Sequence, residues 1–254
     1  MSMEGVVVCG AGVAGLSCAR EIAAAGRELL VVDRARGVGG RCATHRLDGM
    51  AYDVGVSFLH GRDPGFLGAV REATPHRIEG WPRTIRGSGR PCQPEAFRAG
   101  EQRIALADGI TAFPKHLARD LPIRLGARLE RVDVSGERIR LLLDGGEEIV
   151  ARHVVLALAP EQVLRVLPGP GGIPRPLASI RALLEDAASE PSLSVCAAYA
   201  PGVPPPAWDA WYPEDSRILQ FLGNESSKRA APPFTGLVLQ ATPGWARQHL
   251  ADEG

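Results

Sequence analysis

The sequence predicts an α/β protein that opens with a doubly wound, Rossmann-like domain, and three features of its first 33 residues carry this prediction. An apolar, β-branched run at 6–9 ends in a glycine-rich turn, a stretch of helical composition follows at 14–25, and a second apolar run at 28–33 ends in an acid. Strand, helix and strand in this order form a βαβ unit, whose crossover places the two strands in parallel. The chain therefore begins as a parallel sheet with a helix packed on it.

The turn after the first strand has the sequence GAGVAG. Gly10 allows a tight turn, Gly12 lets the backbone approach a pyrophosphate, and Gly15 permits the helix to pack closely on the strand. Phosphates would lie beside Val13 and Ala14, where the unpaired N–H groups and the positive end of the helix dipole favour anions.

An acid closes the second strand at the place where a ribose contact is expected. Asp33 lies 18 residues after Gly15 and is predicted to accept hydrogen bonds from ribose hydroxyls. Together with the glycine turn, it predicts dinucleotide binding. The residues also leave open a glycine turn in a plain α/β protein that binds no ligand.

Further elements are expected along the rest of the chain. The composition favours ribbon and loop at 37–59, helices at 64–70 and 109–120, and irregular or edge structure at 75–95. Strand-like runs at 129–134, 139–143 and 148–150 have hairpin spacing and precede a buried parallel strand at 153–158. A linker is expected at 168–176 and a stiff loop at 201–206.

Composition excludes several classes of function. With 29 basic and 29 acidic side chains, the chain has no field that would hold a nucleic acid. The five cysteines are scattered without a CxxC pair, which fits reduced thiols and argues against a zinc site or any other metal site. The N-terminus carries neither a signal peptide nor an apolar run long enough for a membrane span. We expect a cytoplasmic protein.

Six segments resemble the flavin amine oxidase superfamily and, within it, the renalase-like proteins. The first two, at 10–26 and 31–41, are typical of the superfamily, and the second ends in the sequence RGVGGR. Arg62-Asp63 and the last two segments are typical of the renalase-like branch. The remaining segments complete a resemblance that runs from one end of the chain to the other; all six are 10–26, 31–41, 52–66, 109–122, 154–160 and 237–250.

This resemblance implies an FAD-binding Rossmann-like domain of amine-oxidase type, interleaved with a substrate domain built on an antiparallel sheet. The FAD-binding domain would comprise 1–60 and 105–165, and the substrate domain 61–104 and 166–254. The resemblance assigns the flavin side of the cofactor to Arg34, Gly39, Gly40 and Arg41. It also implies that the backbone of Val132 contacts adenine and that Gly55 approaches the flavin ring.

The resemblance further implies an FAD-dependent oxidoreductase. Its partner would be a small-molecule substrate of dihydronicotinamide or amine type. The enzyme would take a hydride from this substrate and pass it to oxygen or another acceptor. Hydride leaves a carbon without a base, so no protonic triad is needed. The candidates for the catalytic site are His60, Ser57 and Trp211. Ser57 departs from the family, which usually has glutamine two residues after the glycine at position 55.

Two alternatives stay open at this point. One is an NAD(P)-dependent dehydrogenase that uses the same βαβ unit. The other is an incomplete subunit that is not catalytic unless a partner chain supplies the C-terminal flavin-capping segment of renalase-like proteins, which this sequence lacks. The absence of that segment predicts weak retention of FAD by this chain alone.

Overall fold

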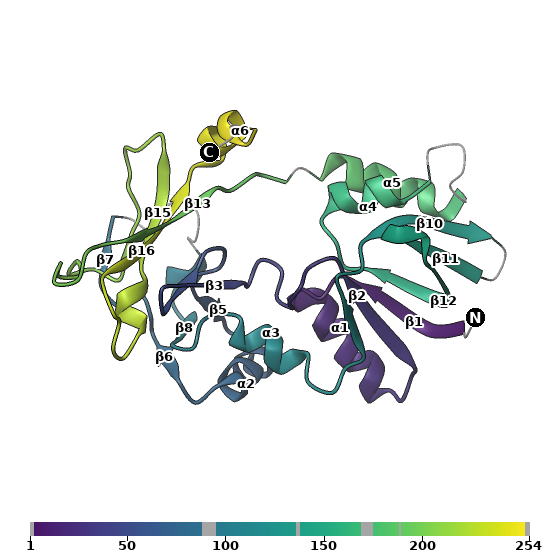
Figure 1. Ribbon diagram of the computed structural model, residues 1–254, viewed down its shortest axis with the longest axis horizontal. Coiled ribbons are helices and arrows are strands. Elements are labelled where there is room, and N and C mark those ends of the chain that lie inside the picture. The colour runs from purple at the N-terminus through teal and green to yellow at the C-terminus, as the bar shows by residue number, and fades with distance from the viewer. Residues whose placement is uncertain (1–2, 88–94, 136–137, 169–174, 188, 252–254) are drawn as a thin grey trace. The chain divides into compact units, whose positions relative to one another are not determined.

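The computed structural model describes residues 3–87, 95–135, 138–168, 175–187 and 189–251 (Figure 1). The chain divides into two compact units, each built from two separate segments. Unit 1 comprises Met1–Gly40 and Leu117–Ser189, and unit 2 comprises Arg41–His116 and Glu190–Gly254.

Unit 1 is built on a six-stranded sheet with the order β10-β11-β12-β1-β2-β9. The strands β12, β1, β2 and β9 are parallel, whereas β10, β11 and β12 form an antiparallel meander. Helix α1 packs against β1 and β2, which completes the predicted βαβ unit and confirms the α/β class. The bounds are β1 Met3–Cys9, α1 Val13–Ala24, β2 Leu29–Asp33, β9 Ile123–Leu125, β10 Leu129–Ser135, β11 Arg138–Leu143 and β12 Glu148–Leu156.

Strand β12 corrects one expectation, because the runs at 148–150 and 153–158 form a single strand. One edge of β12 pairs with β11 as far as Ala151, and the other edge pairs with β1 as far as Leu156. Only residues 151 and 152 separated the two expected runs, and both lie within the continuous strand, Ala151 buried and Arg152 exposed. Among the described residues, the β11-side edge of 153–156 has no strand partner.

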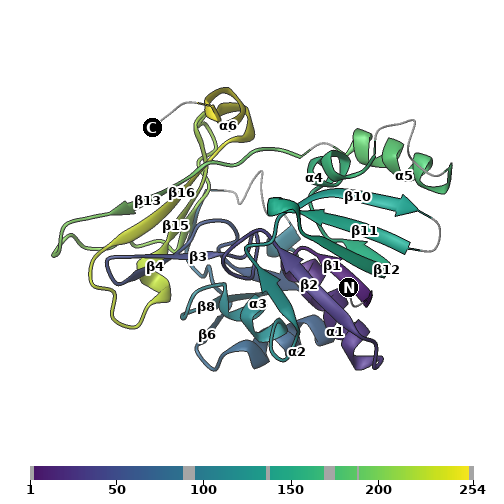
Figure 2. The same ribbon diagram turned by 45° about the vertical axis from the view of Figure 1, so that its right-hand side comes forward.

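Two helices follow the sheet of unit 1, and Figures 1 and 2 show them side by side. Helix α4 spans Pro160–Val166, with proline in its first turn, and α5 spans Arg175–Asp186. The linker expected at 168–176 is therefore shorter than predicted at its end, since α5 begins at Arg175; residues 169–174 lie outside the described part of the chain.

Unit 2 contains a five-stranded sheet with the order β13-β16-β15-β14-β7, antiparallel except for the β14–β7 pair. Two smaller sheets, β5-β8-β6 and β3-β4, accompany it. The strands are β3 Thr44–Leu47, β4 Met50–Asp53, β5 Leu59–Gly61, β6 Arg77–Glu79, β7 Ile85–Arg86, β8 Gln102–Leu106, β13 Ser194–Ala198, β14 Ala210–Trp211, β15 Leu219–Asn224 and β16 Gly236–Ala241.

Two helices of unit 2, α2 and α6, begin after a residue whose side chain caps the helix. Helix α2, Pro64–Ala73, starts after Asp63, whose carboxylate accepts a hydrogen bond from the Phe66 N–H (2.7 Å). Helix α3, Ala112–Leu117, is shorter than the expected 109–120 and has Pro114 in its first turn. Helix α6 spans Pro243–His249. Within the described residues, the 3₁₀ helices are η1 Glu95–Phe97, η2 Asp144–Gly146 in unit 1, and η4 Glu225–Lys228.

The two units alternate along the chain, as the two expected domains do. Their boundaries fall after residues 40, 116 and 189, whereas the domains were placed with boundaries after 60, 104 and 165. The assignment of a cofactor domain and a substrate domain stays a prediction, because contacts within the chain do not decide which segments a cofactor touches.

Candidate functional site

The glycine turn of unit 1 has two positions that exclude a side chain. Gly10 has a φ of 115°, and a Cβ there would overlap the carbonyl oxygen of Ala157 beyond the end of β12. A Cβ at Gly15 would overlap the carbonyl oxygen of Gly10. These two glycines therefore bring α1, the turn and the end of β12 into close contact.

Gly12 differs from the other two glycines of the motif, because a Cβ at Gly12 would meet nothing within 4 Å. Its φ of −77° and ψ of 175° are extended values that any residue adopts. Gly12 is the N-cap of α1, which has no side-chain cap and no acidic residue in its first turn. An uncapped helix start beside open space is the arrangement that a phosphate group needs, since the first N–H groups and the helix dipole then face an anion.

Asp33 connects the end of β2 to the glycine turn. One carboxylate oxygen accepts a hydrogen bond from the Ala11 N–H (2.6 Å) and the other accepts one from the Ala35 N–H (2.7 Å). The side chain is half-buried, and each of its oxygens retains a second lone pair. The carboxylate is thus fixed beside the motif and retains acceptor capacity for a ribose hydroxyl.

The segment after Asp33 folds back over the glycine turn. The Gly39 N–H donates to the Ala11 carbonyl (2.9 Å), and Gly39 forms a parallel bridge with Gly12. Gly40 has a φ of 55°, which favours glycine. The structure therefore brings Gly39 and Gly40 to the motif, whereas the Arg34 side chain is exposed.

Val132 lies on β10, the edge strand of the meander, and is 3% exposed. Its side chain belongs to the core cluster that contains Cys9 and Val32, the residues near the ends of β1 and β2. Burial raises the pKa of the Cys9 thiol to about 12, so this thiol is an inert part of the core.

In unit 2, the predicted flavin-side residues Arg41 and Gly55 lie in adjacent segments. The Arg41 carbonyl accepts a hydrogen bond from the Val56 N–H (3.2 Å), and a Cβ at Gly55 would overlap that same carbonyl oxygen. The Arg41 side chain is exposed. Glycine at position 55 is therefore required by the close approach of the two backbones.

Two of the catalytic candidates, Ser57 and His60, have different surroundings. Ser57 is 6% exposed, and its hydroxyl makes no hydrogen bond within the described part of the chain. His60 Nδ1 lies 3.1 Å from a carboxylate oxygen of Glu101, and Arg62 Nε lies 2.7 Å from the other. Hydrogen bonds from His60 and Arg62 lower the pKa of Glu101, so this acid holds the His60 ring in place.

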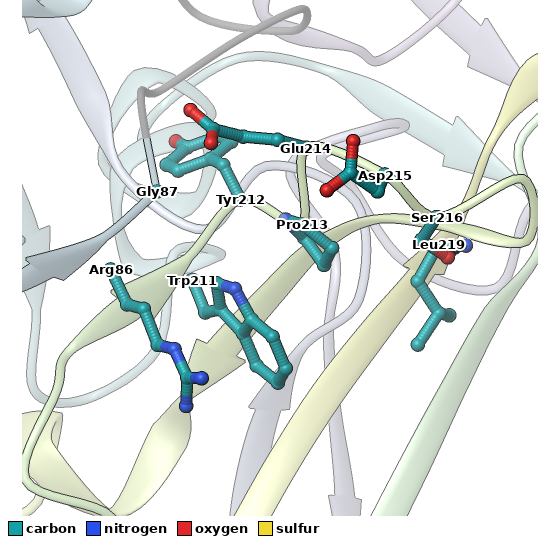
Figure 3. Close-up of a pocket in the computed structure, with 9 residues that line it drawn as sticks. All are labelled: Arg86, Gly87, Trp211, Tyr212, Pro213, Glu214, Asp215, Ser216 and Leu219. Carbon is teal, nitrogen blue, oxygen red and sulfur yellow. Dashed lines mark hydrogen bonds between the residues drawn. The ribbon is translucent and has the colours of Figure 1, made fainter.

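The third candidate, Trp211, lines a cavity of about 500 Å³ in unit 2 (Figure 3). The Arg86 guanidinium lies 4.3 Å from the centre of a Trp211 ring, as expected for a cation–π contact. Tyr212 and Leu219 add apolar wall, and the carboxylates of Glu214 and Asp215 lie on the same cavity. Ser57, His60 and Trp211 share no hydrogen bond or ring contact in the described residues.

A buried ionic cluster of unit 2 was not among the predicted site residues. Lys228 Nζ donates to Asp53 (3.1 Å) and Glu225 (2.7 Å), and all three side chains are fully buried. Arg229 donates to Glu225 (2.9 Å) and to the Asp53 carboxylate (3.4 Å). The sequence held half of the signal, because Glu225, Lys228 and Arg229 have the i, i+3, i+4 spacing of side chains on one helical face.

The two acids of this cluster have opposite pKa shifts. Burial raises the pKa of Glu225 to about 7, although Lys228 opposes the effect. Burial also acts to raise the pKa of Asp53, but the charges of Lys228 and Arg229 outweigh it and hold that pKa below its ordinary value. Asp53 is therefore ionised near neutral pH, and Glu225 is the group that titrates there.

No helix within the described residues is both long and apolar enough to cross a lipid bilayer.

Comparison with known proteins places the chain among flavoproteins. Residues 8–72 match the model of an NAD(P)-binding Rossmann-like domain, and residues 91–251 match that of the flavin containing amine oxidoreductases. Putrescine oxidase of Kocuria rosea is 32% identical over 120 residues, which are 42% of this chain and 25% of that protein. A Mycobacterium tuberculosis protein named as a flavin-containing monoamine oxidase, AofH, is 43% identical over 67 residues, 26% of this chain and 15% of AofH.

Solved structures agree on the fold. Putrescine oxidase bound to putrescine has a TM-score of 0.73 at 13% identity, over 98% of this chain and 78% of that chain. Reduced UDP-galactopyranose mutase has a TM-score of 0.73 at 12% identity, over 94% of this chain and 74% of that chain. At these identities the likeness concerns the fold alone.

The second family match covers well over half of the chain and determines its classification. This match confirms the predicted enzyme class, a flavin-dependent oxidoreductase, and the predicted cofactor, FAD. The first match places the glycine turn in a Rossmann-like domain. The chain spans a quarter or less of the curated relatives that it matches. It belongs to the flavin-containing amine oxidoreductase family.

Proposed function

We propose that this chain is a renalase-like member of its family, an FAD-dependent oxidoreductase that accepts a hydride from a dihydronicotinamide-type or amine substrate and passes it to oxygen or another acceptor. The segments at 154–160 and 237–250, with Arg62-Asp63, support the renalase-like assignment. The names of the relatives, putrescine oxidase and monoamine oxidase, support an amine substrate.

Gly12 is the observation that carries this proposal. Its missing side chain leaves open space beside an uncapped helix start, and no packing or backbone requirement explains glycine at that position. A pyrophosphate does explain it, because the phosphate oxygens need the N–H groups of α1 without a Cβ in the way. We therefore assign the pyrophosphate to residues 10–15, with Val13 and Ala14 as backbone donors, and a ribose to Asp33.

The remaining FAD contacts in the proposal follow the family resemblance. Arg34, Gly39, Gly40 and Arg41 are assigned to the flavin side, and Gly55 to the ring. The Val132 backbone is assigned to adenine. When bound, FAD would supply a two-electron acceptor, and the chain's own residues would bind it and orient a substrate carbon toward it.

The test of cofactor binding is Gly12→Ala, with Gly68→Ala as the matched control. Gly68 lies in α2, and a Cβ there also meets nothing within 4 Å. We expect Gly68→Ala to unfold at a somewhat higher urea concentration than the wild type, because alanine favours a helix interior, and Gly12→Ala at a slightly lower one, because alanine is a poor N-cap; only Gly12→Ala should lose at least tenfold in FAD affinity by calorimetry. Unchanged FAD affinity in Gly12→Ala would remove the pyrophosphate assignment.

The substrate class is tested by anaerobic titration of the FAD-loaded protein. Dihydronicotinamide isomers should bleach the flavin absorbance near 450 nm on the order of 10²-fold faster than putrescine or a simple monoamine if the renalase-like assignment holds. Faster bleaching by an amine would assign an amine oxidase instead. Tighter binding of NAD⁺ than of FAD by the wild type would favour the NAD(P)-dependent dehydrogenase.

A second candidate function is that of an incomplete subunit that needs another polypeptide for catalysis. The β11-side edge of β12 at 153–156, which has no strand partner in the described part of the chain, favours it, because an additional strand paired there would extend the sheet beside Gly10. We expect a supplied C-terminal segment of a renalase-like protein to raise FAD affinity and substrate-dependent oxygen uptake. If full activity occurs without any added segment, this candidate fails.

A further inference from the structure

The backbone segment Val54–Ser57 of unit 2, called here the 54–57 segment, is held by side chains from distant parts of the chain. The Val54 carbonyl accepts hydrogen bonds from the Ser194 hydroxyl (2.8 Å) and from Gln240 Nε2 (3.1 Å). The Gly55 carbonyl accepts a second one from Gln240 Nε2 (2.7 Å). Ser194 and Gln240 are paired residues on β13 and β16, so both side chains extend from the same face of the sheet.

The far end of the 54–57 segment is held by the buried cluster. Lys228 Nζ donates to the Ser57 carbonyl (2.8 Å) in addition to Asp53 and Glu225. An ammonium group has three N–H donors, so these three acceptors satisfy it. Lys228 Nζ also lies 4.4 Å from the Trp81 ring. One donor of a fully buried lysine is thus committed to a single backbone carbonyl.

These contacts exceed what packing requires. Gln240 is half-buried and makes both of its hydrogen bonds to backbone, so burial of an apolar surface does not explain it. An apolar side chain of similar size would cost less to bury than the ammonium group of Lys228, which needs two carboxylates beside it, since taking an ammonium out of water is expensive. The shared result of both side chains is a fixed path for residues 54, 55 and 57.

We propose that Gln240 and Lys228 are positioning residues, which hold the 54–57 segment in the conformation that contacts the flavin ring. The inference rests on the proposed function, because Gly55 is assigned to that ring. Neither side chain touches the ADP half of FAD, which is assigned to unit 1. Their removal should therefore weaken recognition of the ring and spare recognition of ADP.

The test compares the affinities of the full chain for FAD and for ADP, measured by calorimetry. Gln240→Leu removes two hydrogen bonds and should weaken FAD binding about tenfold while ADP binding stays at the wild-type value. Gln240→Lys keeps a donor and should restore most of the FAD affinity. Gln248→Leu, an exposed glutamine of α6, is the matched control and should change neither affinity.

Lys228 needs a compensated variant, because Lys228→Met alone leaves two buried carboxylates with one cation. The double variant Lys228→Met with Glu225→Gln removes one charge of each sign and should give the same selective loss of FAD affinity. The absorbance spectrum of bound FAD, which responds to the ring environment, should shift in both this variant and Gln240→Leu.

The outcomes distinguish a failure of the positioning role from a failure of the proposed FAD site. Equal losses of FAD and ADP affinity in the variants, or no loss of either, would overturn the positioning role without contradicting the proposed binding of FAD by the wild type. If the wild type binds FAD no more tightly than ADP, the ring assignment of the proposed function fails first, and the positioning role fails with it.

Discussion

Gly15 and Gly12 lie three residues apart in one motif and are glycine for different physical reasons. A Cβ at Gly15 would overlap the Gly10 carbonyl oxygen, so Gly15→Ala must push α1 away from the turn. We expect Gly15→Ala to lower the free energy of unfolding by about 3 kcal/mol in urea titrations. Gly12→Ala serves as the comparison, and equal stability of the two variants would show that Gly15 has no packing role.

Glu225 predicts a pH dependence of stability in unit 2. Its pKa is raised from an ordinary 4.5 to about 7, so between these values the folded protein holds a proton that the unfolded chain has released. The free energy of unfolding should therefore fall as the pH rises through this range and become level above it. Asp53 acts in the opposite direction at lower pH, because its lowered pKa contributes stability that is lost on acidification.

The measurement is urea unfolding of the wild type and of Glu225→Gln at pH 5, 6, 7 and 8. Glutamine does not titrate, so the decrease between pH 5 and 7 should be smaller in the variant. The exposed Glu214→Gln should keep the wild-type profile. Identical profiles in all three proteins would contradict the raised pKa.

Residues of the glycine turn were predictable because each acts over a short stretch of chain. Gly10, Gly12, Gly15 and Asp33 follow from one strand, one helix and one strand. The buried cluster was not predictable in the same way. Asp53 and Glu225 are 172 residues apart, and nothing local to Asp53 marks it as one of the charges in this cluster.

At the scale of single elements, the pairing of β12 predicts which of its amides are protected from hydrogen exchange. The Ala157 N–H donates to the Cys9 carbonyl (2.8 Å), and amides alternate in direction along a strand. The amide of Val155 therefore faces β1, whereas those of Val154 and Leu156 face the open edge. By NMR-detected hydrogen exchange, we expect Val155 and Ala157 to exchange at least tenfold more slowly than Val154 and Leu156.

A supplied strand at this edge should protect Val154 and Leu156 as well. Slow exchange of all four amides in the chain alone would mean that the edge is already covered.

The elements themselves were predicted unevenly. The βαβ unit, α2 and the meander have clear apolar runs and turn residues, and they lie where expected. Strand β12 was predicted as two runs separated by residues 151 and 152, yet the exposed Arg152 is accommodated within one continuous strand. Helix α5 was partly assigned to a linker because prolines surround its start, although proline is compatible with the first turn of a helix.

At the scale of the whole molecule, the proposed contacts predict weak retention of FAD by the chain alone. Among the described residues, the β11-side edge of β12 at 153–156 has no strand partner, so no sheet ladder closes this edge near the assigned pyrophosphate site. We expect extensive dialysis of the FAD-loaded protein to remove most of the yellow colour, as followed by absorbance near 450 nm. A sample that stays yellow would contradict this prediction and would argue against the candidate function of an incomplete subunit.

The chain passes from one unit to the other after Gly40, after His116 and after Ser189. On the ribosome, unit 1 lacks the meander until β12 has emerged, and unit 2 lacks β13, β15 and β16 until β16 has emerged. Neither unit can therefore finish folding early in translation, and a nascent chain carries two unfinished sheets at once. Unfinished sheets expose strand edges that pair with other chains. Slow synthesis or a shortage of chaperones should consequently reduce the yield of this protein more than that of a protein whose domains are contiguous.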